Sequence, residues 1–140
     1  MSITTVMSCV NKCDMLKTIL YIGIGSGIGG VARYLLSRVI QEHAGSAVFP
    51  WGTFVVNIIG CLLIGIIYGA LDRGFTLSPE TKAFLTVGLC GGFTTFSTFV
   101  HENYLLFDSG EFPTVAIYAG ISFSVGLLLA YAGHWIAKTI

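Results

Sequence analysis

The sequence has very little charge. Only 10% of its 140 residues are Asp, Glu, Lys or Arg, and 54% are hydrophobic, whereas soluble domains contain about 25% charged residues. So few charges cannot cover a water-soluble surface, and the high hydrophobic fraction excludes a disordered chain. The formal net charge is 0, which argues against nucleic acid as a partner, because that binding depends on clustered Lys and Arg. These properties indicate a small integral membrane protein.

Proline is also scarce, with three residues in the chain, and long apolar runs fill most of the length. A helix that crosses the hydrocarbon needs about 20 apolar residues. The sequence predicts an all-α membrane protein with four transmembrane helices, at residues 18–40, 51–71, 81–107 and 113–137. Ser78 and Pro79 are typical of an N-cap and first helical position, so they predict the start of the third helix.

Residues 1–14 form a polar N-terminal extension, and residues 15–140 form the predicted four-helix domain. The extension lacks the apolar core of a signal peptide. None of the four cysteines has the partners of a metal site, and Cys61 and Cys90 inside the spans are interpreted as small apolar side chains. Basic residues slightly favour the side of the termini and second loop, which predicts cytoplasmic termini.

Glycines recur at four-residue spacing in the first two spans. Gly23 pairs with Gly27, Gly25 with Gly29, and Gly65 with Gly69. In lipid, such pairs allow helix backbones to approach closely. We therefore expect close helix packing, within the chain or in an oligomer.

Two polar residues lie inside the first two spans. Arg33 is either functional, as an intramembrane charge usually is, or reaches the membrane interface with its long side chain. Asn57 stands one turn after Thr53 in an otherwise apolar helix. Its amide either bonds another helix or lines a wet path, where its NH₂ group can donate to an anion.

The third span is the most informative segment. Gly91 and Gly92 precede Thr94 and Thr95, and these residues are poor helix formers. They predict a break in the helix at mid-membrane, although a plain kink packed by neighbours is an alternative. Carbonyl groups freed by a break are oxygen ligands for a hard cation, and broken helices mark ion sites in transporters.

Phe96 and Phe99 share a helix face beside this predicted break, one turn before Glu102. An aromatic ring is positive at its edge, so the two rings can meet a small anion without a full charge that would trap it. In the fourth span, Tyr118 and Ser122 also share a face.

These residues resemble the CrcB/Fluc family of fluoride channels. The resemblance covers almost the whole chain from Met15 and rests on the glycine spacing that ends at Arg33-Tyr34, on residues 50–53 leading to Asn57, and above all on the string from Gly91 to Phe99. It implies an antiparallel, dual-topology homodimer in the cell (inner) membrane, with two fluoride pores and a central structural Na⁺. The small charge bias fits dual topology only loosely, so a paired arrangement with fixed orientation is the alternative. One departure is Gly126, where the family's polar stripe on the fourth helix would continue.

The resemblance also implies roles for single residues. The carbonyl groups of Gly91 and Thr94 would be the sodium ligands, and Phe96 and Phe99 the pore rings. The remaining pore-lining residues would be Asn57, Ser97, Thr98, Glu102, Tyr118, Ser122 and Arg33.

The predicted function is therefore a passive channel, and not an enzyme, that lets fluoride leave the cytoplasm and reduces its toxicity. The alternative is a small four-helix multidrug/proton exchanger, which would need an acidic residue in its first span. Residues 18–40 contain no Asp or Glu. An anchoring or assembly subunit would suit the glycine faces but leaves Asn57 and residues 94–99 unexplained.

Overall fold

The computed structural model describes residues 3–45 and 48–140, with side chains from residue 12 onward. In this part of the chain, four helical segments are long and apolar enough to cross a membrane: Lys12–His43, Trp51–Asp72, Pro79–Asp108 and Phe112–Thr139. The last three begin and end within two residues of the predicted spans, and the first extends further at both ends. The prediction of an all-helical protein with four spans is confirmed.

The third segment consists of several elements in succession. It contains the short helix α3, a π-helical stretch η1, the single turn α4 and the longer helix α5. Its interruption lies at Thr94 and Thr95, which have extended backbone angles (φ −86°, ψ 158° and φ −148°, ψ 113°). The described elements are, in order, α1 (Ile3–His43), α2 (Trp51–Asp72), α3 (Pro79–Ala83), η1 (Phe84–Cys90), α4 (Gly91–Phe93), α5 (Phe96–Asp108) and α6 (Phe112–Thr139).

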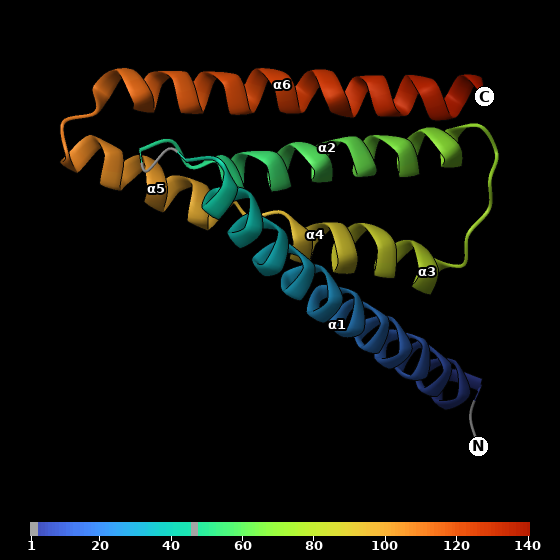
Figure 1. Ribbon diagram of the computed structural model, residues 1–140. Coiled ribbons are helices and arrows are strands. Elements are labelled where there is room, and N and C mark those ends of the chain that lie inside the picture. Colours follow the sequence, from blue (N-terminus) through green and yellow to red (C-terminus); the bar gives the residue numbers. More distant parts are fainter. Residues whose placement is uncertain (1–2, 46–47) are drawn as a thin grey trace.

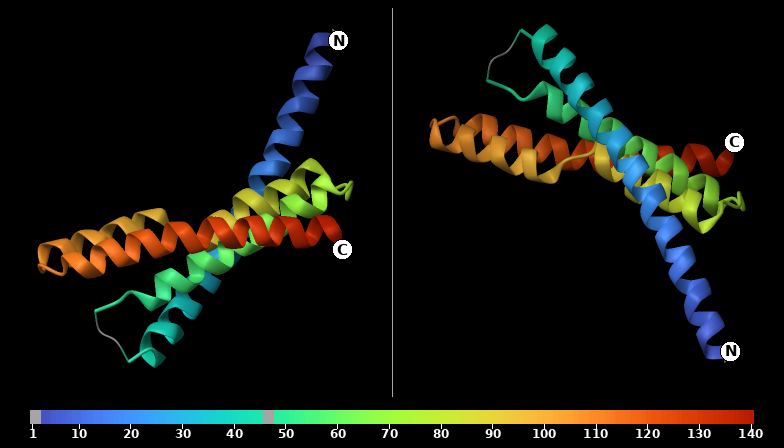
Figure 2. Two further views of the ribbon diagram at one scale, coloured as in Figure 1. Left: turned by 90° about the horizontal axis from the view of Figure 1, so that it is seen from above. Right: turned by 90° about the horizontal axis from the view of Figure 1, so that it is seen from below.

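Two packing arrangements hold the helices together: α2 packs against α6, and α1 packs against η1 and α4. Helices α2 and α6 run side by side, α5 continues along α6, and α1 crosses the segment from α3 to α4 at an angle (Figures 1 and 2). Both termini and the loop between α2 and α3 lie at the same end of the molecule, as four spans require (Figure 1). Helix α1 continues without a break through residue 14, and residues 1–2 and the Cys9 side chain of the predicted extension lie outside the described residues.

Close helix packing depends on the predicted glycines. A Cβ atom at Gly25 or Gly29 of α1 would collide with the backbone of η1 and α4, and one at Gly65 or Gly69 would collide with the backbone of α6. Gly23 and Gly27 have open space beside them instead. One glycine pair of α1 therefore packs within the chain, and the other faces outward.

The helix ends follow local chemistry. The Ser78 hydroxyl accepts a hydrogen bond from the Thr81 N–H (3.2 Å), with Pro79 at the first helical position, so the predicted start of the third segment is confirmed. Two residues after the ends of α2 and α5, Gly74 (φ +104°) and Gly110 (φ +80°) adopt a left-handed conformation that favours glycine and terminates helices. At the last residue of α2, the Asp72 carboxylate lies 2.9 Å from His134 of α6, and this contact joins the two helices.

Candidate permeation site

The side chain of Asn57 forms two hydrogen bonds with the backbone at the interruption in the third segment. Its Oδ1 accepts from the Thr95 N–H (2.8 Å), and its Nδ2 donates to the Thr95 carbonyl (3.2 Å). A break inside a membrane leaves backbone groups that must be satisfied by something other than water. The Asn57 amide supplies both partners that Thr95 needs. Of the two alternatives that the sequence left open, bonding another segment is observed, and Asn57 also lines the cavity described below.

The residues after the interruption form a regular helix start. The Thr95 hydroxyl accepts from the Thr98 N–H (3.3 Å) and thereby caps α5. The sequence predicted Thr95 as part of the break but not as a helix cap, although a Thr three residues before the bonded N–H is a recognisable capping pattern. Thr95 thus bonds Asn57 through its backbone and caps the next helix through its side chain.

The interruption also changes the carbonyl groups before it. In a continuous helix the Gly91 carbonyl would accept from the Thr95 N–H, but that N–H is bonded to Asn57. The Cys90 carbonyl keeps its ordinary helical bond from the Thr94 N–H and also accepts from the Thr94 hydroxyl (both 2.9 Å). The Gly91 carbonyl is therefore freed from its helical partner, next to Thr94.

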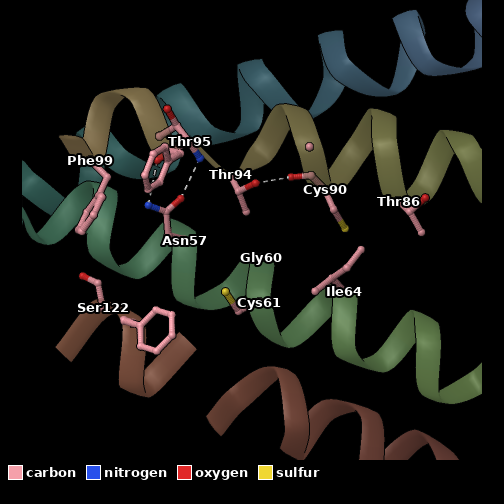
Figure 3. A pocket seen from close by; sticks show the side chains of 13 residues that line it. Asn57, Gly60, Cys61, Ile64, Thr86, Cys90, Thr94, Thr95, Phe99 and Ser122 are labelled. Atoms are coloured by element: carbon pink, nitrogen blue, oxygen red, sulfur yellow. Dashed lines mark hydrogen bonds between the residues drawn. The ribbon is translucent and has the colours of Figure 1, made fainter. Parts of the chain in front are cut away.

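A cavity of about 460 Å³ opens beside the interruption, between α2, the third segment and α6 (Figure 3). Its walls contain amide, hydroxyl, thiol and aromatic groups, and the described residues that line it include no Lys or Arg. Figure 3 shows Asn57 and Thr95 bonded to each other at one end, with Phe99 and Ser122 beyond them. The lining residues are Asn57, Gly60, Cys61, Ile64, Thr86, Cys90, Gly91, Thr94, Thr95, Phe96, Phe99, Ser122 and Phe123.

Phe96 and Phe99 contact each other at this cavity, as their shared helix face predicts. Their ring centroids lie 6.1 Å apart, and the Phe99 ring lies 4.9 Å from that of Tyr118. Phe96 is 78% exposed in the single chain, whereas Tyr118 is completely buried. The rings therefore extend from the outer surface to the core.

The carboxylate of Glu102 is held between two hydroxyl groups. Thr53 donates to its Oε1 (2.7 Å) and Tyr118 donates to its Oε2 (2.8 Å). Both donors are buried, and hydrogen bonds to a carboxylate are about twice as strong as those between neutral groups. A second cavity, of about 230 Å³, lies beside this group and is lined by Ser37, Gln41, Val48, Phe49, Pro50, Thr53 and Glu102.

Of the remaining predicted site residues, only Ser122 lines one of the two cavities. Ser122 lines the larger cavity, and its buried hydroxyl has no hydrogen-bond partner among the described residues. Thr98 is half-buried at the start of α5. Ser97 is exposed and lines neither cavity. Arg33 also lies outside both cavities, and its Nε donates to the Gly92 carbonyl (3.2 Å).

Two features of this site were not predicted. Thr53 bonds Glu102 from α2, and only its position one turn before Asn57 hinted at a role. The π-helical stretch η1, in which the Gly91 N–H bonds the Thr86 carbonyl, directly precedes the interruption. Such stretches are rare and frequently lie at functional sites.

Comparison with known proteins supports a specific family. The family model described as "CrcB-like protein, Camphor Resistance (CrcB)" matches residues 20–134. The chain belongs to the CrcB family. A protein from Flavobacterium psychrophilum, named fluoride-specific ion channel FluC, is 45% identical over 89% of this chain and 100% of its own length. A protein of the same name from Bacteroides fragilis is 47% identical over 88% of this chain and 98% of its own length.

This membership confirms the family predicted from the glycine, Asn57 and Gly91–Phe99 patterns. A protein from Geobacter sulfurreducens, also named fluoride-specific ion channel FluC, is 42% identical over 89% of this chain. The CrcB family match covers the second and third membrane-spanning segments completely and most of the first and fourth, including the interruption and both cavities.

Proposed function

We propose that this CrcB family member is a fluoride-selective channel of the cell (inner) membrane that lets fluoride leave the cytoplasm and so reduces its toxicity. The main support for this proposal is the similarity of the chain, at 45–47% identity over most of its length, to relatives named fluoride-specific ion channel FluC. Its task is passive transport, and it is not an enzyme.

The anion path follows the face of the third segment where Phe96 and Phe99 lie. Helix α5 begins at Phe96, and a helix N-terminus carries a partial positive charge that favours an anion. The positive ring edges add a weak attraction, and the hydroxyl groups of Ser97, Thr98 and Ser122 supply donors, whereas the Tyr118 hydroxyl donates to Glu102. Conduction requires that the ion bind weakly enough to leave, and the absence of Lys and Arg from the larger cavity suits that requirement.

The functional unit is an antiparallel, dual-topology homodimer with two pores. Three glycines that do not pack within the chain support this proposal, because small residues let the helices of two chains approach closely: Gly23 and Gly27 have open space beside them, and Gly91 is exposed. A two-fold axis presents the same surface from both chains. The partner would then cover Phe96 and complete the wall of each path.

The central cofactor is a structural Na⁺ held by the carbonyl groups of Gly91 and Thr94. The fit rests on chemistry: the Gly91 carbonyl is freed from its helical partner, and a hard cation prefers oxygen ligands. Groups of three or more His, Cys, Asp or Glu that could hold a metal are absent from the described residues, so backbone oxygens are the relevant donors. The bound cation would neutralise carbonyl dipoles, and the two chains would supply the ligands together.

The alternative is a proton-coupled multidrug exchanger. That mechanism needs an acidic group in the first span, and residues 18–40 contain none. The carboxylate at the site, that of Glu102, already accepts hydrogen bonds at both oxygens. The site geometry therefore favours the channel.

Efflux from proteoliposomes tests the proposal. Vesicles loaded with fluoride or chloride are diluted into a medium that contains neither of these two anions. An ionophore sets the membrane potential, and no proton gradient is present. We expect rapid fluoride efflux and little chloride efflux. Equal efflux of both anions would contradict fluoride selectivity, and efflux that requires a proton gradient would favour the exchanger.

A further inference from the structure

Arg33 lies in the first membrane span and is half-buried. In the described part of the chain, it forms no ion pair with a carboxylate, whereas Arg38, five residues later, is exposed and pairs with Glu42 at 2.8 Å. A cation in a membrane helix needs compensation for its lost hydration. The partner that the structure gives Arg33 is a backbone group, the Gly92 carbonyl.

That carbonyl belongs to the last turn before the interruption. The half-helix from Pro79 ends at Phe93, so its final carbonyl groups have no following turn to bond them. A helix C-terminus carries a partial negative charge that cations stabilise. The charge on Arg33 and the exposed end of the half-helix therefore compensate each other.

The packing of α1 determines this contact. Gly29, one turn before Arg33, lies against the backbone of Leu89, Gly92 and Phe93, so closely that a Cβ atom there would collide with it. A Cβ atom at Gly92 would likewise collide with the backbone of Ser26. Because the two backbones touch at this point, the Arg33 side chain reaches the end of the half-helix within one turn.

We infer that Arg33 is a positioning residue that caps the C-terminal end of the half-helix before the interruption and thereby holds Thr94, Thr95 and Phe96 in place. Asn57 bonds the interruption from α2, and Arg33 bonds the turn just before it from α1, so side chains of two different helices hold this region. Without the charge of Arg33, the partial negative charge of this helix end would be uncompensated close to the start of α5, and it would disfavour an anion there. The effect on flux rests on the proposed channel function, but the effect on local structure does not.

The test combines hydrogen–deuterium exchange with fluoride efflux for Arg33→Met, Arg33→Gln and Arg33→Lys in the full chain. The matched control is Arg38→Met, which removes a cation from the same helix without touching the interruption. We expect the Met and Gln variants to exchange faster at the amides of residues 92–98 and to lose about tenfold in fluoride flux, as for one charge-assisted hydrogen bond. Arg33→Lys keeps the charge and should restore much of both, and Arg38→Met should change neither.

The two readouts separate the possible outcomes. Lost flux with unchanged exchange at residues 92–98 would overturn the inference, because Arg33 would then act directly on the ion. Unchanged exchange and flux in all three variants would overturn it too. Faster exchange rescued by Arg33→Lys, in a protein whose parent conducts no fluoride, would support the cap while contradicting the channel. If Arg33→Met fails to fold, the Gln and Lys variants decide by the same comparison.

Discussion

Asn57 offers the sharpest test of how the interruption is maintained. Its amide bonds both the N–H and the carbonyl of Thr95. Asn57→Leu keeps the approximate size of the side chain but leaves both backbone groups without a partner. A buried polar group left unsatisfied costs about 1–3 kcal/mol, so the free energy of unfolding should fall by about 2–6 kcal/mol. Fluoride flux should fall as well, since Thr95 also caps α5.

Asn57→Asp separates the two hydrogen bonds. An ionised carboxylate still accepts from the Thr95 N–H, but it cannot donate to the Thr95 carbonyl and instead repels it. A protonated carboxyl group regains the donor. The thermal stability of Asn57→Asp should therefore increase as the pH falls, relative to the unsubstituted protein measured at each pH.

The assays are thermal unfolding in detergent and fluoride efflux from proteoliposomes. Asn103→Leu is the matched control, because the Asn103 amide donates within its own helix, to the Phe99 carbonyl (2.8 Å). It should lose less stability than Asn57→Leu. If Asn57→Leu is as stable and conductive as its parent, the pairing with Thr95 does not maintain the interruption.

Three further predictions concern the rings, the buried carboxylate and the cation. Phe96→Ile or Phe99→Ile removes the positive ring edge, so fluoride flux should fall sharply while gel filtration shows intact assembly; unchanged flux would exclude the ring role. Tyr118→Phe removes one of two hydroxyl donors to Glu102, which should lower the free energy of unfolding by about 1.5–3 kcal/mol, and equal stability in thermal unfolding would contradict that contribution. Replacing sodium by a large organic cation should shift the dimer in detergent towards monomer and reduce flux; an unchanged equilibrium and flux would remove the structural ion.

The sequence by itself determined the four spans, the start of the third helix and the family. Each of these depends on local or strictly ordered information. A membrane helix satisfies its own backbone, so an apolar run of sufficient length identifies it without knowledge of its neighbours. Ser78 and Pro79 act within one turn, and the string from Gly91 to Phe99 is specific in the order of its residues.

Only the tertiary structure decided which groups bond across the helices. The sequence left open whether Asn57 bonds a helix or faces a path, and it assigned no partner to Arg33. Each answer depends on how far one helix is rotated and shifted against another, and a displacement of one residue would turn Asn57 away from Thr95 or Arg33 away from Gly92. That register arises from backbone contacts at glycines such as Gly29 and Gly92, and a glycine that packs looks the same in the sequence as one that faces outward, like Gly27.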